Sequence, residues 1–139
     1  MIQILRSILA VVAGIIVGSI VNMGIIMLSN SIIMPPEGVN PSDMESLKAS
    51  MHLFEPKHFL MPFLAHAIGT LVGAFVAGLI ALNHKLIISL VIGFFFLLGG
   101  ITSIFMLPSP LWFTITDLGL AYLPMAWFGF KLQNSLIKK

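Results

Sequence analysis

Four long apolar stretches, separated by short polar segments, dominate this chain. They run over residues 4–34, 58–82, 86–107 and 111–132. Each holds about the 20 residues that a helix needs to cross a bilayer. Pro124 removes a backbone hydrogen bond from the last stretch and is expected to kink it. The pattern predicts an all-α integral membrane protein, a four-transmembrane-helix bundle that forms a single domain over residues 1–139.

The composition supports this class of protein. Only 9% of the residues are charged and 58% are hydrophobic, whereas soluble domains carry about a quarter charged residues. A net charge of +2 is too small to indicate nucleic-acid binding. The chain has no cysteine, which excludes disulfides, thiol catalysis and thiolate metal sites. No cofactor is expected; the expected partners are the lipid bilayer and either a second copy of the chain or another membrane protein.

Residues 35–57 form the only sizeable polar segment between the apolar stretches. Ser42 and Glu45 have the spacing of a capping box at the start of a helix. Apolar residues recur on one side of the helix that would follow, at Met44, Leu47, Met51 and Phe54. We expect a short amphipathic helix that lies at the interface or caps the bundle, where it could also serve as a lid over a substrate entrance.

Small residues recur at every fourth position in the first two apolar stretches. Gly14 and Gly18 belong to such a seam in the first stretch, and Gly69 and Gly73 in the second. Small side chains let helix backbones approach closely in lipid, where little hydrophobic force acts between helices. We therefore expect these two helices to cross at their glycines, since no other pair of stretches offers matching seams.

The distribution of lysine and arginine predicts the orientation in the membrane. The side with the two termini carries five basic residues, Arg6, Lys85, Lys131, Lys138 and Lys139. The other side carries two, Lys48 and Lys57. Because basic residues are enriched in cytoplasmic loops, both termini are expected in the cytoplasm and residues 35–57 on the outer side.

Three of the apolar stretches each carry a polar residue in their outer half, namely Asn22, His66 and Asp117. At about 1.5 Å of helix per residue, His66 and Asp117 lie at matching depths. A lone carboxylate is expensive in hydrocarbon, so these two side chains are expected to meet directly or through one water. Thr70 and Thr114 lie one helical turn from them. All five residues form the candidate ligand- or ion-binding site.

A second candidate lies on the outer side, where His52, Glu55 and His58 are spaced three residues apart. Imidazole and carboxylate groups bind zinc when their geometry converges. Pro56 interrupts the helix that would align these side chains. No metal site is therefore predicted, and this trio stays as an alternative only.

Two classes of function fit these features, with a third behind them. The first is a non-catalytic membrane protein that packs through its glycine seams, as an oligomer or as a subunit of a larger complex. The second is a small transporter or permeation unit that uses the intramembrane polar site. The third is an intramembrane enzyme with His66 as base and Asp117 as its orienting partner, although no nucleophile or substrate clamp lies near. A cavity from the outer surface down to Asp117 would favour transport, whereas a filled core would favour the structural role.

Overall fold

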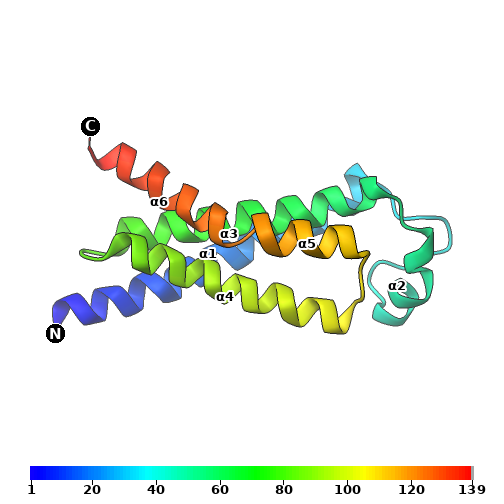
Figure 1. Ribbon diagram of the computed structural model, residues 1–139, viewed down its shortest axis with the longest axis horizontal. Helices are drawn as coiled ribbons and strands as arrows, with labels where there is room; N and C mark the ends of the chain where they lie inside the picture. Colours follow the sequence, from blue (N-terminus) through cyan, green and yellow to red (C-terminus); the bar gives the residue numbers. More distant parts are fainter. Residues whose placement is uncertain (139) are drawn as a thin grey trace.

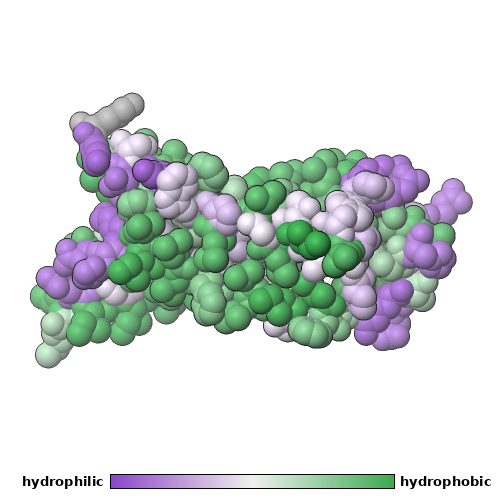
Figure 2. Space-filling view, in the orientation of Figure 1, coloured by the Kyte–Doolittle hydropathy of each residue, from purple (hydrophilic) through white to green (hydrophobic). Residues whose placement is uncertain are grey.

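The computed structural model describes residues 1–138, and these residues form helices, turns and loops without any strand. Three helical segments are long and apolar enough to cross a membrane. They are α1 (Ile2–Ile32), α3 (Leu60–Ile80) with the 3-10 turn η2 (Pro56–Phe59) before it, and α4 (Lys85–Met106). Apolar residues cover the middle of the molecule, and hydrophilic residues gather at its two ends (Figure 2). The chain is a small helical membrane protein.

The fourth predicted span is two helices rather than one. α5 (Leu111–Leu120) and α6 (Leu123–Ile137) are separated by a turn at Ala121 and Tyr122. Pro124 lies in the first turn of α6, where its missing N–H removes no intrahelical bond. The structure therefore has a complete break where the sequence predicts a kink. α6 extends past residue 132, the predicted end of this stretch. Neither half reaches the length of about 20 residues that a crossing requires, and the segment is not among the candidate spans.

The helices give the molecule two distinct ends (Figure 1). Both chain termini and the turn between α3 and α4 lie at one end, here called the terminal end. The 108–110 turn and the short helix α2 (Met44–Ser50) lie at the opposite end, here called the α2 end. Lys139, one of the basic residues behind the predicted orientation, lies outside the described residues.

The polar segment contains the short helix that its apolar pattern predicts. α2 is followed directly by the 3-10 turn η1 (Met51–Leu53), and both lie beyond the ends of α4 and α5 (Figure 1). The capping residue is Asp43, whose carboxylate accepts a hydrogen bond from the N–H of Glu45. The predicted capping box of Ser42 and Glu45 is therefore wrong, because the helix begins one residue later than that box requires.

α1 and α3 are in backbone contact at four glycines. A Cβ atom added to Gly14 would lie 2.7 Å from the carbonyl oxygen of Gly73. One added to Gly18 would lie 2.7 Å from the carbonyl oxygen of Gly69. Real Cβ atoms essentially never come closer than 3.0 Å to another heavy atom. No larger residue therefore fits at this crossing without moving the helices apart.

α6 packs through small residues as well, and against two helices. A Cβ atom added to Gly129 would lie 2.5 Å from the carbonyl oxygen of Leu71 in α3. One added to Gly93 in α4 would lie 2.6 Å from the Cβ of Ala126. The expectation that no other pair of helices offers matching seams is therefore wrong. The small residues of α6 stand between aromatic residues in the sequence, so they do not show the regular spacing of a seam.

Candidate functional site

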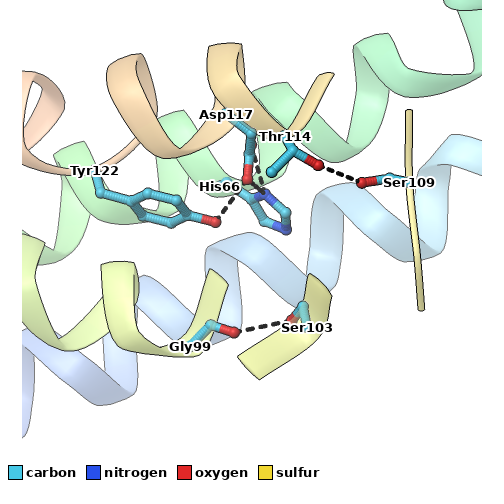
Figure 3. Close-up of polar contacts among 7 residues, drawn as sticks. All are labelled: His66, Gly99, Ser103, Ser109, Thr114, Asp117 and Tyr122. Carbon is cyan, nitrogen blue, oxygen red and sulfur yellow. Dashed lines mark hydrogen bonds and ion pairs between the residues drawn. The ribbon is translucent and has the colours of Figure 1, made fainter. Parts of the chain in front are cut away.

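Asp117 is the centre of three hydrogen-bonded side chains, here called the Asp117 cluster (Figure 3). Nδ1 of His66 lies 2.8 Å from Oδ1 of Asp117 and 3.0 Å from its Oδ2. The hydroxyl of Tyr122 donates a hydrogen bond to Oδ2 at 2.9 Å. The meeting of His66 and Asp117 that their matched depth predicts is thus a direct contact between α3 and α5.

The break between α5 and α6 is what brings Tyr122 to Asp117. In a continuous α-helix, side chains five residues apart point about 140° away from each other. Tyr122 has φ −114° and ψ −82°, which lies outside the helical region. Its hydroxyl reaches back to Asp117, and its ring stacks on that of His66 with the centroids 5.8 Å apart. The local geometry of the break therefore completes the cluster.

Burial and bonding differ between the two ionisable partners. The side chain of Asp117 is 7% exposed and that of His66 is 22% exposed. Both carboxylate oxygens of Asp117 accept hydrogen bonds. The tautomer of His66 assigned from this contact carries its proton on Nδ1, which donates it to Asp117. Nε2 of His66 is then left free to accept a hydrogen bond from a ligand.

A cavity of about 370 Å³ lies at the α2 end and reaches the Asp117 cluster. His66 and Asp117 line it, together with residues of α1, α4 and η2. The apolar stripe of α2 and the residues after it lines the same cavity, through Met44, Leu47, Met51 and Phe54. The amphipathic helix thus covers the cavity with its apolar side. The volume falls within the range of roughly 300–1,000 Å³ that is usual for ligand sites.

A second cavity of about 150 Å³, here called the polar chamber, adjoins the first. His66, Gly100 and Ser103 line both cavities. Asn22 and Thr70 line the polar chamber only. Asn22 and Thr70 therefore share a space with His66, as their positions in the sequence predict, but neither is hydrogen-bonded to the Asp117 cluster.

Other predicted site residues lie apart from the Asp117 cluster, although His58 lines the larger cavity. The hydroxyl of Thr114 is hydrogen-bonded to that of Ser109 at 3.0 Å, so it fastens the turn before α5 and lines neither cavity (Figure 3). Nδ1 of His58 accepts a hydrogen bond from the backbone N–H of Glu55. Among residues 1–138, no three His, Cys, Asp or Glu side chains converge as metal ligands. His52, Glu55 and His58 are thus not brought together in this structure.

Tyr122 and Gln133 are buried polar residues that belong to no site predicted from the sequence. Tyr122 reads as one of several aromatic residues near the membrane interface, and only the nearby Pro124 signals that the helix breaks beside it. Gln133 is fully buried in α6 against Gly78. Neither polar atom of the Gln133 amide has a hydrogen-bond partner within residues 1–138. Gln133 follows the last predicted apolar stretch and stands beside Asn134 and Ser135, so no sequence pattern marks it as buried.

The Asp117 cluster is suited to binding a polar group and holding or moving a proton at Nε2 of His66. A carboxylate that orients an imidazole is also the geometry of a general base. In the part of the chain described here, Asp117 is the only side chain hydrogen-bonded to His66, so no hydroxyl is held ready as a nucleophile. The geometry therefore supports ligand binding more than covalent catalysis.

Comparisons with protein-family models, with curated proteins and with solved structures find no match for this chain. The functional conclusion therefore rests on the cavity and on the polar side chains that line it.

Proposed function

We propose that this protein is a small transporter or permeation unit whose ligand occupies the cavity at the α2 end. The observation that carries the proposal is the course of this cavity, which runs from the apolar stripe of α2 to His66 and Asp117. Ionisable residues that face a cavity within a membrane mark substrate, ion or proton pathways. A filled core would instead favour a purely structural role.

The opposite half of the bundle is closed. Ala74, Ala77, Ile92 and Ala126 form a fully buried apolar cluster there. The backbone contact of Gly14 with Gly73 lies between the polar chamber and the terminal end. The cavity is therefore closed toward the terminal end, as it would be in the outward-facing state of a transporter.

A purely structural subunit that associates through its glycine seams has less support. The four seam glycines contact each other within one chain, so they are not available to a second copy. Exposed glycines remain at Gly24, Gly99 and Gly119, where an added Cβ would meet nothing within 4 Å. These three glycines form no seam with four-residue spacing along any one helix.

We further propose four membrane crossings, with α5 and α6 together forming the last one. The two termini lie at the same end of the molecule (Figure 1), which requires an even number of crossings. The excess of basic residues at the terminal end favours a cytoplasmic location for that end. The α2 end and its cavity then face outward.

Cysteine labelling tests this orientation, since the chain has no cysteine of its own. We expect Lys48→Cys to react with a membrane-impermeant maleimide in intact cells, because Lys48 is exposed at the α2 end. Lys138→Cys should react only after the cells are opened. Labelling of Lys138→Cys in intact cells, with a control cytoplasmic protein unlabelled, would contradict the proposed orientation.

The same approach tests whether the cavity is a route for solutes. Ser103 lines both cavities, and Phe105, two residues further on the same helix, is 83% exposed on the apolar surface. Because a maleimide reacts with a hydrated thiolate, we expect Ser103→Cys to be labelled from the outer side much faster than Phe105→Cys. Equal, slow labelling of both variants would show that solutes do not enter the cavity, and would contradict its role as a binding site.

Transport also requires the terminal half to open at times. Ala77 is fully buried there, whereas Lys85 lies at the start of α4 near the terminal surface. In inside-out vesicles, Lys85→Cys should be labelled at once and Ala77→Cys slowly but to completion. If Ala77→Cys stays unlabelled while Lys85→Cys reacts fully, the protein binds its ligand without transporting it.

A further inference from the structure

The polar chamber contains buried hydrogen-bonding groups that the protein does not satisfy. The hydroxyl oxygen of Thr70, a residue with no exposed surface, has no hydrogen-bond partner within residues 1–138. The same holds for Oδ1 of Asn22, on the facing helix α1. Leaving such a group unpaired is costly in an apolar interior, and more so at membrane depth. These two groups therefore point to a ligand group that sits between them.

The chemistry of the chamber selects the kind of group that would fit. Oδ1 of Asn22 accepts hydrogen bonds, Nε2 of His66 accepts them in the assigned tautomer, and the Thr70 hydroxyl both donates and accepts. The hydroxyl of Tyr122 is already used on Asp117. No lysine or arginine lines the chamber, so nothing there would neutralise an anion. A neutral hydroxyl matches these partners because it donates to one and accepts from another.

The lining of the adjoining larger cavity indicates the chemistry of the rest of the ligand. Its walls are mostly apolar, with Met44, Met51 and Phe54 on the α2 side. Methionine side chains are flexible and adapt to apolar shapes of different size. Both cavities share His66, Gly100 and Ser103, so one molecule can occupy both.

We infer that the two cavities together bind an amphipathic molecule, with a hydroxyl head in the polar chamber and a hydrocarbon body against α2. This inference rests on the proposed function and adds the class of ligand to it. The polar head lies beside the Asp117 cluster, where Nε2 of His66 accepts a hydrogen bond from the hydroxyl group. Gly99 and Ser103 are exposed on α4 while lining the chamber, so a molecule dissolved in the bilayer reaches the chamber past this helix.

Matched probes test the inference on the full chain in phosphatidylcholine nanodiscs. The probes are 4-octylphenol, 4-octylanisole, in which a methyl group caps the hydroxyl, and 4-octylbenzoate. Equilibrium dialysis against empty nanodiscs measures the excess of each probe that the protein retains. We expect the phenol to bind about tenfold more tightly than the anisole, the factor that one well-made hydrogen bond supplies.

Variants connect this preference to the chamber. Thr70→Val keeps the shape of the side chain and removes its hydroxyl, so the preference for the phenol should fall to about the level of the anisole. Asn22→Leu should also lower the preference for the phenol. It replaces Thr70→Val as the test if Thr70→Val lowers the unfolding temperature of the protein. Thr102→Val is the control, since the hydroxyl of Thr102 donates to the carbonyl of Leu98 and lines neither cavity.

The outcomes separate the two proposals. If the phenol and the anisole bind equally, or the benzoate binds best, the hydroxyl inference is overturned and the cavity remains a ligand site. If no probe is retained above empty nanodiscs, the proposed function itself is overturned. A phenol preference that survives in both chamber variants would also overturn the inference, because the hydroxyl would then bind elsewhere.

Discussion

Replacing Gly73 by leucine is expected to lower the free energy of unfolding by at least about 3 kcal/mol, since even single added methylenes in a packed core cost about 1–3 kcal/mol. A Cβ atom on Gly73 would lie 2.6 Å from the carbonyl oxygen of Gly14. The obstacle is helix backbone, which cannot turn aside as a flexible side chain can. The two helices must separate, and the contacts along the whole crossing of α1 and α3 weaken together.

Gly24→Leu is the matched control for this prediction. Gly24 lies in α1, six residues beyond Gly18, and a Cβ atom added there would meet nothing within 4 Å. The same change of residue type should therefore leave the unfolding temperature in detergent unchanged or slightly raised. Equal losses of stability in Gly73→Leu and Gly24→Leu would show that the crossing does not depend on close approach.

The contact between His66 and Asp117 is expected to show strong coupling in a double-mutant cycle. Removing one partner of a buried hydrogen bond typically costs about 1–3 kcal/mol, because the other partner is left unpaired. His66→Leu and Asp117→Leu should each have an effect of at least this size on the free energy of unfolding. The double variant should cost clearly less than the sum, since neither residue is then left without the other.

Thr114→Val provides the control for this cycle. The hydroxyl of Thr114 is hydrogen-bonded to Ser109 and not to the Asp117 cluster, so its loss should cost about 0.5–1.5 kcal/mol, as a neutral hydrogen bond does. Its coupling with Asp117→Leu should be smaller than the coupling of His66→Leu with Asp117→Leu. Strict additivity of His66→Leu and Asp117→Leu would be incompatible with the direct contact at 2.8 Å.

The parts of the site that the sequence predicts are those that depend on position along regular helices. Depth in a membrane follows from the number of residues between a side chain and the end of its helix. The matching counts for His66 and Asp117 are therefore enough to predict that they meet. The apolar stripe of α2 follows from helical spacing in the same way. Both predictions need only the regular geometry of one α-helix.

The parts that the sequence does not predict depend on where helices stop. Tyr122 joins Asp117 only because α5 ends at Leu120 and α6 starts at Leu123, and helix ends are poorly defined by residue pattern. The start of α2 at Met44, after Asp43 rather than Ser42, differs for the same reason. The polar chamber depends on distances among four separate elements, which no local pattern contains.

The division of the proposed last crossing into α5 and α6 affects how the chain is inserted as it is made. The ribosome releases the three long spans first, and α5 with 10 residues and α6 with 15 follow. Neither is long enough to insert by its own hydrophobicity. Gly129 and Ala126 fit closely against α3 and α4, so we expect the earlier spans to serve as a template that holds α6 in the bilayer. Because Asp117 and Tyr122 belong to this late segment, a nascent chain forms the Asp117 cluster only after the last helix is made.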